Sequence, residues 1–359
     1  MNVGKANISK VICLFDLTDQ LLNRLPAFLN VELKHWHLTE MLSADRSRYR
    51  DLLRGIGWES VSAVVIFGHR MPDMLLCIAA QRRGVPVYYV QHGLFKERLE
   101  RNKRTVWSLV RKKAYYYLHS FFCARRGAQD VVNLRLFVLL VRSAFWSNRN
   151  LAEALSHCRA FIEVAYVFDD RQKIEYRKIF GDGLRNIITM GNVDAGRIAA
   201  ETPNKKSAII LCQSLVEDGR LSASAYKANL VAAIDTLEQD GWAVSLFLHQ
   251  RSDIKLYNER GLEEKVILNS WSVPSCELYL TDYSSLILEP FYKGRYVSRL
   301  DISGHVPMNE VSFIPTYPDR TRRGEGELYE NPFEFVSEHL KNHIDSGWEK
   351  GASTLDKGS

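Results

Sequence analysis

The chain has 359 residues, of which 46% are hydrophobic and 25% charged, and its formal net charge is +6. This composition is typical of a globular protein, is sufficient for two domains with a core each, and excludes a disordered or low-complexity chain. The six cysteines are scattered, without a C-x-x-C pair or a His/Cys cluster at zinc spacing, which predicts a reducing compartment and no zinc site. No apolar stretch has the length of a membrane span or of a signal-peptide core, so we expect a cytoplasmic protein.

The first half of the chain alternates between strand-like and helix-like segments. Helical patterns such as DMLLCIAAQRRG (73–84) and EYRKIFGDG (175–183) lie between short apolar runs that are typical of buried strands. The strand-like runs are KVICLFD (10–16), VSAVVIFG (61–68), VPVYYVQ (85–91) and NIITMG (186–191).

The second half repeats this alternation. Its helical patterns, 222–241 and 285–294, both end in glycine, as a helix C-terminus often does. The alternation predicts an α/β fold in which a parallel sheet is covered by helices on both faces, once in each half. The strand-like runs are SAIILCQ (207–213), WAVSLFLH (242–249), ELYLTD (277–282) and RYVSRL (295–300).

A polar stretch with a proline, AAETPNKKS (199–207), separates the two halves. We therefore predict two Rossmann-like domains, 1–200 and 201–350, and a disordered tail at 351–359 that has nothing apolar to bury. Open α/β sheets bind ligands beyond the carboxyl ends of their strands, so two such domains facing each other would form a cleft lined by strand-end loops. The chemistry is expected at these strand ends.

A basic stretch runs from Lys96 to Arg126 and holds ten Lys/Arg against two Glu, interleaved with aromatic residues. The apolar segment NLRLFVLLVRSAFW (133–146) follows it. We interpret 96–147 as a helical insertion in the first domain that could lie on an anionic membrane surface, although a buried helix beside a solvated basic face explains the pattern equally well. Nucleic-acid binding ranks last, because no recognised binding motif accompanies the charge.

Polar motifs follow the predicted strands in both halves. His92 and His249 each end a buried-strand pattern, one in each half, whereas His69 is a weaker candidate of the same kind. The candidates in the first domain are Gln91, His92, Gly93, Asn192 and His69. The candidates in the second domain are Gln213, Ser214, His249, Arg251, Asp282, Ser284, Ser285 and Glu289.

The serine pair Ser284 and Ser285 lies where a buried strand gives way to a helix. Backbone N–H groups are unpaired at the first turn of a helix and the helix dipole is positive there, so hydroxyls at this place can help to hold a phosphate. The simpler alternative is that Asp282 or Ser284 only caps the helix.

The segments LFLHQR (246–251) and LTDYSSLILEPFYKGRYV (280–297) resemble the second half of the GT-B transferases that build bacterial surface polymers. They are similar to the CDP-glycerol glycerophosphotransferase family, which carries a His-Pro motif, then T-D-Y-S-S and an acid. That family's His-Gly and G-N-P-R-x-D-like segments resemble VQHG (90–93) and MGNVD (190–194). Here Gln250 replaces the proline, MGNVD lacks Pro-Arg, and HGLF replaces His-Gly-Thr-Pro. The stretch ILCQSLVEDGRLSASAY (210–226) also resembles bacterial sialyltransferases and polysialyltransferases, which use CMP-sugars.

The resemblance implies a GT-B fold and a donor activated by CMP or CDP. By match to the family, His92 would be the catalytic base, since an imidazole titrates near neutral pH. His249, Ser284 and Ser285 would hold the donor phosphates, and Glu289 would accept hydrogen bonds from ribose hydroxyls.

The remaining candidates receive less defined roles. Asp282 would orient one of the two histidines or cap the helix, Arg251 would pair with a phosphate or remain exposed, and Gln213 and Ser214 would contact the donor. The acceptor side would be lined by Gln91, Gly93, Asn192 and the weaker candidate His69. Neither a metal nor another cofactor is required, because the helix dipole, His249 and the hydroxyls can carry the leaving-group charge.

The sequence lacks the motifs of other enzyme classes: it has no P-loop, no G-x-G-x-x-G after a strand, no H-E-x-x-H and no G-x-S-x-G. The acid pair in FDD (168–170) is expected to begin a helix rather than to bind metal. The leading hypothesis is a transferase that moves a sugar or a polyol phosphate from a CMP- or CDP-linked donor to a surface polysaccharide or lipid-linked acceptor at the inner face of the bacterial membrane. A non-catalytic glycan- or nucleotide-binding module is the alternative.

Overall fold

The structure is a computed structural model of the chain. Several predicted features lie outside the residues that it describes: His69, His92, Gly93, Arg251, the insertion at 96–147 and the tail at 351–359. The described residues are 11–15, 32–36, 55–67, 76–77, 79–80, 83–91, 162–180, 186–192, 196–217, 221–249, 252–258, 261–267, 272–282, 284–302, 313–322, 335–336, 338–340 and 342.

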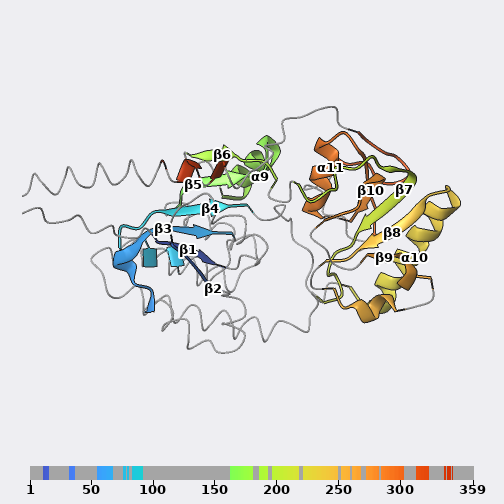
Figure 1. The fold of residues 1–359 in the computed structure, drawn as a ribbon, viewed down its shortest axis with the longest axis horizontal. Coiled ribbons are helices and arrows are strands. Elements are labelled where there is room, and N and C mark those ends of the chain that lie inside the picture. Colours follow the sequence, from blue (N-terminus) through green and yellow to red (C-terminus); the bar gives the residue numbers. More distant parts are fainter. Residues whose placement is uncertain are drawn as a thin grey trace, which may run out of the picture. The chain divides into compact units, whose positions relative to one another are not determined.

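The chain forms two compact units, each with its own sheet (Figure 1). Among the described residues, the first unit contains everything up to Met190 together with the helical residues 335–342, and the second unit contains Gly191 to Arg322. Residues 191–200, which we predicted in the first domain, therefore belong with the second unit, whereas 335–342, which we predicted in the second domain, belong with the first.

The first unit is built on a six-stranded parallel sheet. Its central strands are buried at nearly every residue, as expected when helices or loops cover both faces. The helix α9 (Asp170–Phe180) follows the fifth strand, and the Asp169 carboxylate accepts a hydrogen bond from Gln172 N at 2.8 Å, which confirms that FDD begins a helix. The strands in sheet order are β2 (Glu32–Trp36), β1 (Val11–Phe15), β3 (Val61–Ile66), β4 (Val87–Val90), β5 (Ile162–Val167) and β6 (Ile187–Thr189), and the turn η1 (Trp58–Ser60) precedes β3.

The helical residues 335–342 complete the first unit from the far end of the sequence. Figure 1 shows them in red beside β5 and β6. Val336 and Leu340 are buried, and the Tyr166 hydroxyl of β5 forms a hydrogen bond of 2.8 Å with His339 Nδ1. The first unit therefore combines residues that precede the second unit in the sequence with residues that follow it.

The second unit contains a five-stranded parallel sheet. Its long helix α10 (Ala223–Gln239) begins at Ser222, whose hydroxyl accepts a hydrogen bond from Ala225 N, and it contacts the strand that follows it (Figure 1). The strands in sheet order are β11 (Tyr296–Arg299), β10 (Cys276–Thr281), β7 (Asn204–Leu211), β8 (Ala243–Phe247) and β9 (Val266–Ile267). The shorter helical elements are η4 (Ile254–Tyr257), η5 (Glu263–Lys265), η6 (Ser285–Ile287) and α11 (Leu288–Tyr292).

These two sheets confirm the predicted α/β class with one Rossmann-like parallel sheet in each half. Cys77, Cys212 and Cys276 are buried, and none of these three forms a disulfide bond. Across the described ranges, no helix combines the length and the apolar character that a membrane crossing demands.

Buried tyrosines give the fold a predictable response to alkali. Burial raises the pKa of Tyr279 from 10.0 to about 12, and it also raises the pKa values of Tyr88, Tyr166, Tyr226 and Tyr257. Above pH 10 the unfolded chain releases these protons while the folded chain retains them, so the tyrosines should lower the free energy of unfolding as the pH rises above that value. Urea midpoints at pH 8, 9.5 and 11 test this, and a midpoint that does not change up to pH 11 would contradict it.

Candidate functional site

The carboxyl ends of three neighbouring strands in the second unit carry most of the predicted donor-side residues. The last residues of β10, β7 and β8 lie in register, because Thr281 pairs with Leu211 and Leu211 pairs with Phe247. The strand order also reverses here: the chain proceeds from β7 to β8 and β9 on one side and from β10 to β11 on the other. Open α/β sheets bind their ligands at such a reversal, beyond the carboxyl ends of the strands. The turns after β7 and β10 flank that point.

The turn after β10 is held by two hydroxyl groups. Thr281 Oγ1 donates to the carbonyl of Leu211 at 3.0 Å and accepts from Ser284 N at 2.9 Å, so it ties the turn to the neighbouring strand. Ser284 is the N-cap of η6, and its hydroxyl oxygen accepts from Leu286 N at 3.3 Å. Of the two capping alternatives, Ser284 rather than Asp282 caps the helical segment.

A capping serine keeps part of its hydrogen-bonding capacity. An oxygen that accepts an N–H still carries an O–H to donate, so the capping role of Ser284 leaves phosphate binding open. Ser285, the first residue of η6, is half-buried, and Asp282 is 2% exposed. The roles predicted for these three residues stay predictions.

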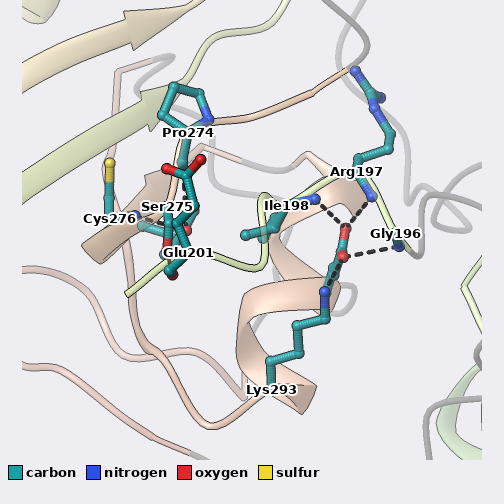
Figure 2. Close-up of polar contacts among 10 residues, drawn as sticks. Gly196, Arg197, Ile198, Glu201, Pro274, Ser275, Cys276 and Lys293 are labelled. Carbon is teal, nitrogen blue, oxygen red and sulfur yellow. Dashed lines mark hydrogen bonds and ion pairs between the residues drawn. The ribbon is translucent and has the colours of Figure 1, made fainter. Parts of the chain in front are cut away.

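Glu289, in α11, braces the beginning of the second unit. Its carboxylate is fully buried, and one oxygen accepts from Gly196 N at 2.9 Å while the other accepts from Arg197 N at 3.1 Å and from Ile198 N at 3.2 Å. Lys293, one turn later in the chain, donates to the first oxygen at 2.6 Å. Figure 2 shows these four donors converging on one carboxylate.

This arrangement has a local backbone cause. Gly196 has a φ of +83°, a conformation that glycine adopts readily, and it opens a run of three consecutive N–H groups directed at one anion. The same segment then continues beside 273–275, where Val273 N donates to the Arg197 carbonyl at 2.7 Å. The Ser275 hydroxyl donates to the Glu201 carbonyl at 2.6 Å (Figure 2). Glu289 therefore holds backbone in this structure, and its predicted contact with ribose stays a prediction.

Asn192 joins the serine turn to the same segment. Its side-chain amide is buried and donates to the Ser285 carbonyl at 3.2 Å. We predicted Asn192 as an acceptor-side residue of the first domain, but the structure places it in the second unit, directly on the predicted donor turn. The serine turn is thus linked to 191–198 through both Ser285 and Glu289.

The turns after β7 and β8 are connected to each other. Gln213 is half-buried and Ser214 is 2% exposed, and both follow β7 directly. Further along this turn, Glu217 accepts from Asp253 N at 2.5 Å, while Ser252 N donates to the His249 carbonyl at 2.9 Å. The half-buried His249 therefore lies in a turn that is fixed against the β7 turn.

A pair of buried tyrosines connects α10 with η4, the short helical segment that follows the β8 turn. The hydroxyls of Tyr226 in α10 and Tyr257 in η4 lie 2.9 Å apart, and their rings meet edge to face at 6.2 Å. Single Tyr226→Phe and Tyr257→Phe variants should each lose about 1–3 kcal/mol of unfolding free energy, since each removes one partner of a buried hydrogen bond.

The double variant provides the control for this pair. Because it leaves neither hydroxyl unpaired, it should lose much less than the sum of the single changes. Urea unfolding of the four proteins measures the coupling, and strict additivity would show that the hydroxyls do not interact.

In the first unit, Gln91 occupies the carboxyl end of β4. It is fully buried; its side-chain oxygen accepts from Phe168 N at 2.9 Å, and its amide nitrogen donates to the Gln172 side chain at 2.6 Å. Its backbone N also donates to the Tyr166 carbonyl. Gln91 thus fixes the direction in which the chain leaves β4 toward His92, and its predicted acceptor contact stays a prediction.

Sequence reasoning missed several residues that shape these turns. Thr281, Gln172, Glu217 and the tyrosine pair were not predicted, and only Thr281 had a signal, since it begins the T-D-Y-S-S motif. Within the described part of the chain, no three His, Cys, Asp or Glu side chains gather as metal ligands would. The prediction that no metal is required stays a prediction.

No protein-family model matches the chain, and no curated protein matches it. Among solved structures, UDP-N-acetylglucosamine 2-epimerase from Rickettsia bellii is similar over 95% of this chain and 96% of its own length, with 12% identity and a TM-score of 0.47. UDP-GlcNAc 2-epimerase from Neisseria meningitidis bound to UDP-GlcNAc is similar over 81% of this chain and 82% of its own length, with 10% identity and a TM-score of 0.41. The wall teichoic acid polymerase TagF is similar over 95% of this chain and 84% of its own length, with 9% identity and a TM-score of 0.42.

Proposed function

We propose that this protein is a transferase that moves a sugar or a polyol phosphate from a nucleotide-activated donor to a glycan or lipid-linked acceptor. The donor is a CMP- or CDP-linked compound, and its nucleotide and phosphates bind to the second unit. No metal or other cofactor takes part. The protein works in the cytoplasm, where residues 96–147 contact the inner face of the membrane.

One observation carries the proposal. The predicted donor residues of three turns, Gln213 and Ser214, His249, and Ser284 and Ser285, follow three adjacent strands whose last residues are in register at the reversal of strand order. These residues are dispersed in the sequence, and the sheet brings their turns to one edge. Hydroxyl donors and an imidazole at this edge suit a phosphate ligand better than an apolar one.

The proposed division of labour follows from the chemistry of transfer. The acceptor hydroxyl must lose a proton and the departing phosphate must be stabilised. His92, after the β4 end in the first unit, takes the proton. His249 and Ser285 donate hydrogen bonds to the donor phosphates, and Ser284 adds its O–H while its oxygen caps η6. Asp282, next to this turn, orients an imidazole.

Calorimetry of the full chain with CMP, CDP and UDP tests the donor site. We expect a cytidine nucleotide to bind and the His249→Ala and Ser285→Ala variants to bind it about 10-fold or more weakly, as the loss of a charge-assisted hydrogen bond requires. Ser224→Ala is the matched control, because Ser224 is an exposed serine on α10 in the same unit.

The outcomes separate the alternatives. Binding of the nucleotide without turnover of any CMP- or CDP-activated donor, in the presence of oligosaccharide and lipid-linked acceptors, would favour a non-catalytic binding module. Turnover with a CMP-sugar or with a CDP-alditol would identify the transferred group. Failure of all three nucleotides to bind would remove the proposal.

A further inference from the structure

The second unit carries a row of alternating cations and aromatic rings, which we call the cation–aromatic row and define as Lys206, Trp242, Arg320, Tyr296 and Arg322. The Lys206 ammonium lies 4.7 Å and the Arg320 guanidinium 5.3 Å from the centre of the Trp242 ring. Arg320 also lies 5.1 Å from the centre of the Tyr296 ring, and Arg322 lies 4.3 Å from it. Arg320 therefore bridges the two rings.

The row follows from the local strand pairing. Thr321 pairs with Val297 of β11 in antiparallel fashion, through backbone hydrogen bonds of 3.0 and 3.1 Å. Side chains alternate between the two faces of a strand, so the neighbours of Thr321 share one face with Tyr296, the neighbour of Val297. Trp242 immediately precedes β8, and Lys206 lies near the start of β7. The row thus lies at the amino end of the sheet, opposite the edge that carries the proposed donor site.

The Lys206 ammonium donates to the backbone carbonyl of Asp240 at 3.3 Å, and in the part of the chain that the structure describes no carboxylate pairs with a cation of the row. Within the described residues, Lys206, Arg320 and Arg322 take part in no salt bridge. Two nearby carboxylates hydrogen-bond to neutral groups: Glu277 accepts the backbone N–H of Lys206 at 2.7 Å, and Asp240 accepts the hydroxyl of Tyr317. Their charges therefore lie near the row without forming a salt bridge with its cations. The side chains of Arg320 and Arg322 are exposed and are held in place by the rings. A guanidinium stacked on a ring keeps its in-plane N–H groups available to an anion.

The geometry favours one kind of partner. Three ordered cations in a row exceed what a single phosphate or carboxylate can contact, since residues two apart on a strand, such as Arg320 and Arg322, are separated by about 6.6 Å. Trp242 is 5% exposed and both rings are already covered by cations, which leaves no aromatic platform for stacking nucleic-acid bases. The large hydrophobic side chains that are exposed in the described residues, Ile174, Val231 and Ile254, lie outside the row, so the row offers nothing to insert into a bilayer.

We propose that the cation–aromatic row is a docking surface for an acidic polysaccharide, a linear polymer with repeated carboxylate or phosphate groups. The choice of a polysaccharide rests on the proposed function, whereas the charge and the geometry of the row stand without it. The polymer contacts Lys206, Arg320 and Arg322 in succession, away from the donor edge of the same sheet, so it can remain bound while a donor is exchanged.

Fluorescence anisotropy of the full chain with a labelled polysialic acid chain, and with dextran of the same length as a neutral comparison, tests the row directly. We expect polysialic acid to bind, and its binding to weaken as salt rises from 50 to 200 mM, as it does for polyanions generally. The Arg320→Gln/Arg322→Gln variant should bind about 10-fold more weakly, while Arg320→Lys/Arg322→Lys, which keeps the charge, should recover most of the affinity.

The matched control is Arg177→Gln/Lys255→Gln, which removes the same charge from exposed side chains outside the row and should change the affinity by less than about 2-fold. Equal weakening by this control, equal binding of dextran, or binding unaltered by the change at Arg320 and Arg322 would overturn the proposal. So would tighter binding of an oligothymidylate or of anionic lipid vesicles, lost in the same variant. Thermal midpoints of all variants show whether they fold, and nucleotide calorimetry on the same samples reports the donor site separately.

Discussion

Glu289→Ala is expected to lower the free energy of unfolding of the second unit by about 2–4 kcal/mol. The substitution removes a fully buried carboxylate and deprives Gly196 N, Arg197 N and Ile198 N of their common acceptor, while Lys293 loses its partner. The Lys293 side chain is 38% exposed and can turn to water, so most of the loss comes from the backbone amides and the cavity. Urea unfolding followed by tryptophan fluorescence measures the effect.

Two further substitutions control this prediction. Glu289→Gln keeps the shape and one acceptor oxygen but directs an NH₂ group at backbone donors, so its loss should be smaller but still measurable. Glu264→Ala removes an exposed glutamate of the same unit and should stay within about 0.5 kcal/mol of the parent protein. If Glu289→Ala also stayed within that range, the carboxylate would not brace 196–198.

Glu289→Gln also distinguishes bracing from ribose binding. If the carboxylate only holds backbone, the folded fraction of this variant should bind the nucleotide with unchanged Kd. A Kd that rises about 10-fold or more in a protein that is still folded would instead support the ribose contact that the family resemblance implies.

His92→Ala is expected to lower turnover about 10²–10⁴-fold without changing the Kd for the donor nucleotide. The physical reason is a separation of tasks: His92 follows β4 of the first unit, whereas the proposed donor residues belong to the second. The variant should also lose the acidic limb of the pH–rate profile, since a general base must be deprotonated to act. Initial rates with the preferred donor, together with calorimetry on the same protein, measure both quantities.

His69→Ala is the comparison for this variant, because His69 follows β3 as His92 follows β4 but is the weaker candidate. Its turnover should fall much less. An unchanged rate for His92→Ala would remove this residue as the base. A loss of nucleotide binding in His92→Ala would instead place His92 at the donor site.

The hydrophobic pattern was sufficient to predict most strands and the fold class. Central strands such as β3, β4, β7 and β10 each contain four consecutive buried residues, which are almost all apolar, as expected for strands covered on both faces. We did not predict β5, although its residues Val164 to Val167 are buried like those of the other central strands. The pattern also missed β2 at the edge of the sheet, where ELKHW has a mixed polar sequence, and the two-residue β9.

The candidate site was predictable only in part. Strand-end positions follow from the sequence pattern, and the structure brings the turns after β7, β8 and β10 to one edge. The partners of each side chain do not follow from it. Glu289 is held by amides far from it in the sequence, and Gln91 by Phe168 and Gln172, so only the folded chain reveals these contacts.

The contribution of residues 335–342 to the first unit has a consequence for biosynthesis. During translation, the residues from Gly191 to Arg322 leave the ribosome as a continuous stretch and can complete the second sheet early. The first unit must wait, because Val336, His339 and Leu340 are made only after the residues of the second unit from Gly191 to Arg322. Until then the face of β5 around Tyr166 lacks its cover, so a nascent chain that stalls before Phe335 would expose an unfinished apolar surface to chaperones and proteases.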